Sequence, residues 1–139
     1  GRLLGASDPG LSRDGVHLAA DDPVPTGLAP SAWVGRSCHN RDDLAAAAAQ
    51  GCTHATLSPI APTASKPGYG PALGTGALAD PPLPTYALGG IDGPAAATAC
   101  VAAGAHGVAV MGALMRADRP DRLVADLLDS LPPTPEPPA

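Results

Sequence analysis

The sequence predicts an α/β fold built on a parallel sheet, and three observations support this prediction. Short apolar runs with strand character alternate along the chain with Ala-rich segments of helical character. Pro clusters near residues 23–30, 59–71, 81–84 and 132–138 lie between these segments, so they mark loops and not one disordered tract. The resulting β-α-β-α order requires parallel strands, either in a doubly wound sheet or in a (β/α)₈ barrel. Since such a barrel normally needs about 250 residues, the pattern alone favours the open sheet for a chain of 139 residues.

Five apolar runs are expected to be strands. They are 15–19, 33–37, 54–57, 85–88 and 107–111. No strand-like run precedes them, and the chain starts without an initiator Met, so we expect a processed, cloned or incomplete product.

Three helices are expected between and after the strands. Asn40 is a good N-cap for the first, with Asp43 three residues later and Gly51 as its C-terminal stop. Pro94 suits the first position of the second helix, which runs to Gly104. The last opens near Pro120 and carries leucines at helical spacing. We therefore predict one domain over residues 1–131, followed by a disordered Pro-rich tail over 132–139.

Composition excludes several classes of function. The net charge is −5 with only eight Lys and Arg residues, which leaves no basic face for nucleic acid. No apolar run approaches the length of a membrane span, and no signal peptide is visible. Three cysteines without metal-ligand spacing predict reduced thiols and a cytoplasmic protein.

Two glycine-containing turns follow the last two expected strands. One is the segment from Leu88 through Gly89 and Gly90 to Ile91, and the other is Met111–Gly112. Glycines let the backbone approach a ligand closely, and adjacent turns of this kind form a phosphate pocket in barrels. Either turn alone would indicate only a tight strand-to-helix connection; the pair favours phosphate binding.

The long loop over 58–74 is a second candidate site. It carries the hydroxyls of Thr63 and Ser65 and the only lysine of the chain, Lys66, beside several glycines. Loops of this length in compact domains are commonly functional, and this composition favours a phosphate or pyrophosphate ligand over a merely solvated lysine.

Two further groups lie at strand ends. Ser37 and His39 are two residues apart and should point the same way, whereas Cys38 should pack in the core. Histidine can act as an acid or base near neutral pH, although a simple hydrogen bond near the helix start is about as well supported. Asp21 and Asp22 follow the first strand and could hold Mg²⁺, or could be a solvated acidic pair.

These segments together resemble a known family. DGVHL with its trailing DD, GRSCHN, TLSPIAPTASKPGYGPALG, YALGGI and GVAVMGALM are similar, in order and approximate spacing, to thiamine phosphate synthases and the related TenI-type thiazole tautomerases. The similarity runs from about residue 14 to residue 129. It implies a TIM-type (β/α)₈ barrel, here a partial barrel that holds the fourth to eighth units.

The resemblance also implies roles for individual residues. A synthase couples hydroxymethylpyrimidine pyrophosphate to thiazole phosphate and releases pyrophosphate with the help of Mg²⁺. Asp22 then resembles a Mg²⁺ ligand, and Ser37 and Lys66 resemble pyrophosphate contacts. The implied contacts to the thiazole phosphate are Thr63, Ser65, Gly89, Gly90, Ile91, Met111 and Gly112.

The sequence leaves alternatives open. In a tautomerase, His39 would move protons on a thiazole carboxylate phosphate without a metal. Arg36 leans toward that branch, Asp22 leans toward the synthase, and Ala19-Ala20 replaces the usual Gly-Gln. A third possibility is a truncated, non-catalytic phosphate-binding remnant. Unpaired sheet edges in a partial barrel would also favour a homo-oligomer.

Overall fold

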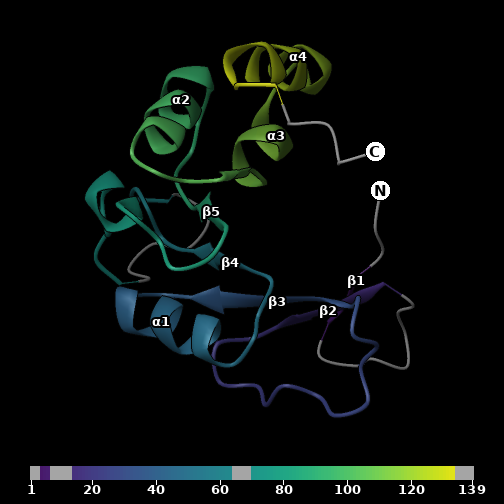
Figure 1. Ribbon diagram of the computed structural model, residues 1–139. Coiled ribbons are helices and arrows are strands. Elements are labelled where there is room, and N and C mark those ends of the chain that lie inside the picture. Colours follow the sequence, from purple (N-terminus) through teal and green to yellow (C-terminus); the bar gives the residue numbers. More distant parts are fainter. Residues whose placement is uncertain (1–3, 7–13, 64–69, 134–139) are drawn as a thin grey trace.

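The computed structural model describes residues 4–6, 14–63 and 70–133. Six strands form one parallel sheet in the order of the chain, each strand pairing with the next (Figure 1). The strands are β1 (Leu4–Ala6), β2 (Gly15–Leu18), β3 (Trp33–Cys38), β4 (His54–Leu57), β5 (Thr85–Leu88) and β6 (Gly107–Ala109). This in-order parallel pairing is the arrangement of a barrel and not of a doubly wound sheet, in which the strand order reverses.

The strands β2 to β6 confirm the five predicted runs, with two corrections. The expectation that no strand precedes residue 14 was wrong, because β1 pairs with β2 from Leu4 opposite Gly15. The last strand ends at Ala109 and not at Met111, since the backbone turns there into a short helix. The other strand ends differ from the prediction by at most one residue.

The helices α1 (Arg41–Ala49), α2 (Pro94–Ala102) and α4 (Pro120–Ser130) confirm the three predicted ones. The side chain of Asn40 caps α1 by accepting a hydrogen bond of 2.8 Å from the backbone N–H of Asp43. Gly51 follows α1 with a φ of +80°, the left-handed conformation of a C-terminal stop. The short helix expected after Gly74 is a 3₁₀ turn, η2 (Thr75–Leu78), and a further short helix, α3 (Gly112–Arg116), was not predicted.

The helices are distributed unevenly around the sheet. In Figure 1, α2, α3 and α4 gather beside β5, whereas α1 lies at the other side of the chain near β3. No helix occurs in the connection between β2 and β3, residues 19–32. Val24 and Leu28 of this connection pack against the core in place of a helix.

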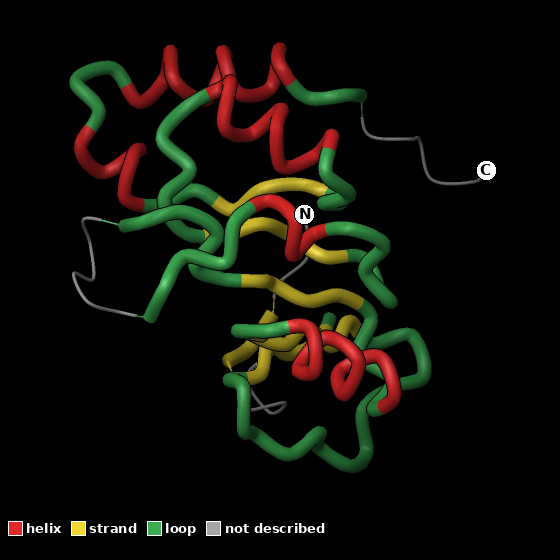
Figure 2. Tube along the Cα trace, turned by 90° about the vertical axis from the view of Figure 1, so that its left-hand side faces the viewer, coloured by secondary structure: helices red, strands yellow, loops and turns green. Residues whose placement is uncertain are grey.

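The two faces of the sheet differ in burial. Side chains at alternate positions, such as Val16, Leu57 and Ala87, are fully buried on the helix-facing side. The positions between them carry half-exposed His17, His54 and other polar or aromatic side chains. Figure 2 shows the strands passing through the middle of the chain, with helices above and below. The half-exposed face corresponds to the inside of a barrel.

The core is built from small aliphatic side chains, as the composition predicts, and all three cysteines are buried and free. Burial raises the pKa of the Cys38 thiol to about 11, with a further increase from the nearby Asp43 carboxylate. Within the described part of the chain, no helix is long and apolar enough to cross a membrane.

Candidate phosphate-binding site

A cavity of about 530 Å³ lies at the carboxyl ends of β2 to β6. It contains almost every described residue that the sequence analysis selected from separate motifs. These are Ser37, His39, Thr63, Gly89, Gly90, Ile91, Met111 and Gly112. Ligands of parallel α/β folds bind at this end of the strands, so the position agrees with a binding site.

The turn after β5 requires glycine for two reasons. Gly89 and Gly90 have φ values of +92° and +69°, which side chains other than glycine rarely adopt. A Cβ atom on Gly90 would also lie 2.6 Å from the carbonyl oxygens of Ala61 and Pro62. The loop after β4 therefore packs directly on this turn, and the backbone N–H of Ala61 donates to the Gly89 carbonyl at 3.0 Å. These glycines shape the cavity wall through loop packing as well as through access for a ligand.

The second turn leads from β6 into α3. Met111 precedes the first residue of α3, Gly112, and its side chain is 66% exposed at the cavity. Both turns line the same cavity, and phosphate binding there stays a prediction.

Ser37 and His39 line the cavity together, and Cys38 between them is fully buried, as their alternation along β3 predicts. The Nδ1 atom of His39 lies 3.0 Å from the carbonyl oxygen of Ser58. A carbonyl oxygen can only accept, so this contact is a hydrogen bond in the tautomer that carries its proton on Nδ1. The backbone N–H of His39 donates to the Asp43 carboxylate at 2.8 Å, which fixes the residue at the start of α1.

The Ser37 hydroxyl has a hydrogen-bonding partner on the neighbouring strand β2. The Nε2 atom of His17 on β2 lies 3.1 Å from the Ser37 hydroxyl oxygen. Burial lowers the pKa of His17, so this ring is neutral at physiological pH. Ser37 lines the cavity, whereas His17 contacts its hydroxyl from β2 without lining the cavity itself.

The long loop lines the cavity with Ser58, Pro59, Pro62 and Thr63, of which Thr63 is a predicted phosphate contact. Ser65 and Lys66 fall outside the described residues, and their predicted phosphate contacts remain predictions. Leu73 and Gly74, beyond that gap, donate backbone hydrogen bonds to Pro59 and Ile60 at 2.9 Å each. Both ends of the loop are therefore anchored beside the cavity.

Asp22 is the one described site residue that does not line this cavity. Its carboxylate accepts from the backbone N–H of Ala19 at 3.1 Å and lines a neighbouring hollow with Asp21 and Arg36. The buried Arg36 side chain donates to the carbonyls of Ala19 and Ala20, at 3.0 and 2.8 Å, and so holds this turn. Ala20 lines both hollows and marks where they adjoin.

The donor set at this turn suits Mg²⁺ in kind, because carboxylate oxygens are the protein ligands that it prefers. Asp21 and Asp22 supply two carboxylates next to the cavity. In the described part of the chain, no group of three or more His, Cys, Asp or Glu side chains gathers as a metal site. A cation here would need oxygen ligands from a bound phosphate as well.

Sequence reasoning missed two charged residues at the cavity, Asp92 and Arg116. They come from different strand-to-helix connections and form an ion pair at 3.4 Å. Neither belongs to a recognisable motif, so only the three-dimensional arrangement reveals them.

The in-order parallel sheet, with a cavity at the carboxyl ends of its strands, places the chain in the parallel β/α-barrel class. The sequence profile described as thiamine monophosphate synthase matches residues 9–114. The chain belongs to this family, and the resemblance noted in the sequence is confirmed.

Individual relatives agree with this membership. The thiamine-phosphate synthase of Parasynechococcus marenigrum is 40% identical, over 87% of this chain and 36% of that protein. A putative thiamine-phosphate synthase of Geobacter sulfurreducens is 39% identical, over 86% of this chain and 60% of that protein. The chain thus spans between 36% and 60% of the length of these two relatives.

A solved structure confirms the fold. The thiamine phosphate pyrophosphorylase of Pyrococcus furiosus superimposes with a TM-score of 0.68 at 24% identity, over 84% of this chain and 58% of that one. The prediction of a partial TIM-type barrel is therefore confirmed, with β1 as one strand more than expected.

Proposed function

We propose that this chain carries the thiazole-phosphate half of a thiamine-phosphate synthase site, in a protein that couples hydroxymethylpyrimidine pyrophosphate to thiazole phosphate and releases pyrophosphate. The observation that supports this most strongly is the single cavity that gathers residues from four separate sequence motifs at the carboxyl ends of the strands. Family membership supplies the reaction class.

Each part of the cavity has a role in this proposal. The backbone N–H groups around Gly89, Gly90 and Gly112 bind the phosphate of the thiazole, and Thr63 adds a hydroxyl donor. Ser37 and Lys66 bind the pyrophosphate that leaves. Because pyrophosphate departs as an anion while the pyrimidine is transferred to the thiazole, donors directed at this leaving group stabilise the transition state.

Mg²⁺ belongs to the proposal through Asp22, with Asp21 beside it. When bound, the cation neutralises charge on the pyrophosphate group. Arg36 positions the carboxylates by holding the backbone of their turn. We place the reaction in the cytoplasm, in line with three buried free thiols.

The test is a turnover assay on the chain as given. The two substrates are mixed with and without Mg²⁺, and thiamine phosphate is quantified by liquid chromatography, with Ser37→Ala as the matched variant. Mg²⁺-dependent product that falls at least tenfold in the variant supports the synthase. Binding of thiazole phosphate by calorimetry without any turnover would instead indicate a non-catalytic remnant that keeps the phosphate pocket.

A tautomerase is the second candidate, and the position of His39 favours it. The ring lies in the main cavity with its Nδ1 atom beside the Ser58 carbonyl oxygen, whereas Asp22 lies in the adjoining hollow. In this candidate, Nε2 of His39 takes a proton from the ring of a thiazole carboxylate phosphate and returns it at another carbon. No metal takes part.

An isomerisation assay with thiazole carboxylate phosphate distinguishes the two activities. Activity that persists in a chelator and disappears in His39→Ala, with phosphate binding kept, supports the tautomerase. Turnover that survives His39→Ala removes this residue from the mechanism.

The sequence also predicts a homo-oligomer, which light scattering on the same sample tests.

A further inference from the structure

An ion pair lies at the mouth of the main cavity. The Nη2 atom of Arg116 donates to the Oδ1 atom of Asp92 at 3.4 Å, and both residues line the cavity. Their side chains are 52% and 73% exposed, so the pair stands in solvent at the rim. Neither residue has a role in the proposed function described above.

The pair connects the two turns that form the phosphate pocket. Asp92 comes two residues after Gly90, and Arg116 comes one helical turn after Gly112, at the end of α3. Arg116 is the only Lys or Arg among the described residues that line the cavity. It is therefore the described arginine that can reach a phosphate bound in this cavity.

The contact between Arg116 and Asp92 is weak for an ion pair. A well-formed charge-assisted hydrogen bond of this type is about 2.7–2.9 Å long. Arg119 and Asp121, on the neighbouring surface, reach 2.7 Å, whereas Arg116 and Asp92 remain at 3.4 Å. Exposed pairs contribute little to stability, so the Arg116 guanidinium can exchange partners at small cost.

We propose that Arg116 binds the substrate phosphate at the cavity mouth, and that Asp92 holds this guanidinium while the site is empty of substrate. A phosphate dianion offers the planar guanidinium two acceptors in place of one carboxylate oxygen, which makes the exchange favourable. The inference rests on the proposed phosphate-binding function and adds a specificity residue to it. It also gives Asp92 a role, as a competitor that weakens the binding of anions.

A purely structural role makes a different prediction. If the pair only braced the two turns, removing either partner would loosen the pocket, and both variants would bind phosphate ligands more weakly. If Arg116 is the ligand and Asp92 its competitor, the two variants must change affinity in opposite directions. The direction of the change for Asp92 therefore decides between the two roles.

The experiment measures binding of thiazole phosphate by calorimetry to the wild-type chain and three variants. We expect Arg116→Gln to weaken binding about tenfold, since a hydrogen bond to a charged group is lost. Asp92→Asn should tighten binding about threefold, since an exposed ion pair no longer competes. Arg119→Gln removes an exposed arginine outside the cavity and should change nothing. Raising the salt concentration should shrink the difference between wild type and Arg116→Gln.

The outcomes separate the inference from the function on which it rests. Unchanged affinity in Arg116→Gln, or weaker binding in Asp92→Asn, overturns the role of this pair while the phosphate site stands. A wild-type chain that binds no thiazole phosphate overturns both. All three substitutions are at exposed positions, and denaturant unfolding of each variant verifies that the fold is intact.

Discussion

Replacing Gly90 with alanine would test whether loop packing, and not only ligand access, requires glycine at the turn after β5. The alanine would have to adopt the left-handed backbone conformation of Gly90, with a φ of +69°. It would also lie 2.6 Å from two carbonyl oxygens, those of Ala61 and Pro62. Because both oxygens belong to backbone, no side-chain rotation can relieve the overlap, and the loop after β4 must move.

The expected loss of stability follows from three contributions. The left-handed conformation costs an alanine roughly 1–2 kcal/mol. Alanine also lowers the conformational entropy of the unfolded chain, which offsets about 0.4–1 kcal/mol of this cost. Displacing the packed loop adds about 1–3 kcal/mol, by analogy with overpacked cores. We therefore expect Gly90→Ala to lower the free energy of unfolding by about 1–5 kcal/mol.

Gly27 provides the matched control. It also has a positive φ, +81°, but no heavy atom lies within 4 Å of its Cβ position. Gly27→Ala carries the conformational cost without the overlap, so its loss should be about 1 kcal/mol. Urea unfolding of both variants gives the comparison. Equal losses of unfolding free energy in the two variants would refute the packing argument. If the loop after β4 moves, Gly90→Ala should also weaken phosphate binding.

Two further predictions concern the half-buried histidines of the sheet and the fully buried Cys38. Burial lowers the pKa of His17 and of His54 from 6.5, so the unfolded chain binds protons that the native chain excludes. The free energy of unfolding should consequently fall as pH drops below about 6.5. In His54→Gln this free energy should depend less steeply on pH. Urea titrations from pH 7.5 to 5 that give the same pH dependence for wild type and variant would contradict the prediction. Burial raises the pKa of Cys38 to about 11, so the native thiol should not react with a disulfide reagent at pH 8. In the urea-unfolded chain the same thiol should react. Rapid labelling of Cys38 in the native chain would contradict the raised pKa.

The fold could be predicted largely because its signals are local. Each strand from β2 to β5 has an apolar run of ordinary length, and α1 has its cap, Asn40, and its stop, Gly51, in the sequence itself. β1 has neither feature. Its three residues lie among Gly and Ser, and they are a strand only because β2 offers a parallel partner. Pairing of this kind cannot be recognised from one segment alone.

The candidate site was predictable where its residues sit in motifs at strand ends. Parallel strands bring those ends together, so Ser37, His39 and the two glycine turns meet in one cavity. The sequence did not indicate that Asp22 lies outside this cavity. Its position depends on how the buried Arg36 side chain holds the turn at residues 19–22. The pairing of Asp92 with Arg116 depends similarly on how two connections approach each other in space.

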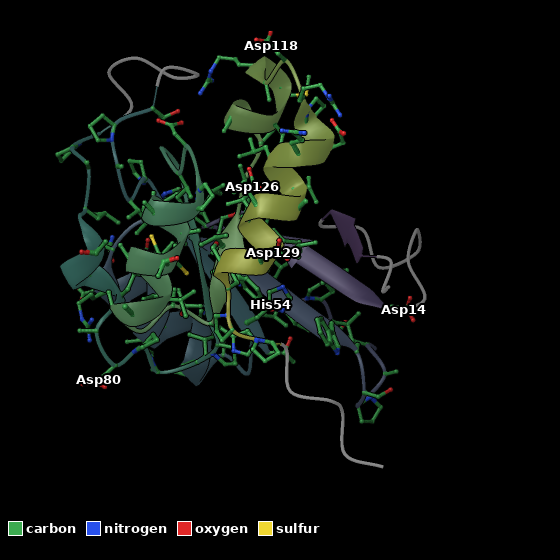
Figure 3. All side chains as sticks on the ribbon, turned by 90° about the horizontal axis from the view of Figure 1, so that it is seen from above. Asp14, His54, Asp80, Asp118, Asp126 and Asp129 are labelled. Carbon is green, nitrogen blue, oxygen red and sulfur yellow. The ribbon has the colours of Figure 1, made fainter. Side chains whose placement is uncertain are left out.

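The half-exposed face of the sheet, which carries His54, has a practical consequence. Trp33, the only tryptophan of the chain, lies at the amino end of β3 with its ring centroid 5.6 Å from that of His54. Figure 3 shows His54 toward the opposite end of the molecule from Asp118, which precedes α4. The intrinsic fluorophore thus sits at the end of β3 remote from the cavity. Its emission will report the opening of the sheet during unfolding, while substrate titrations will need an extrinsic label or calorimetry.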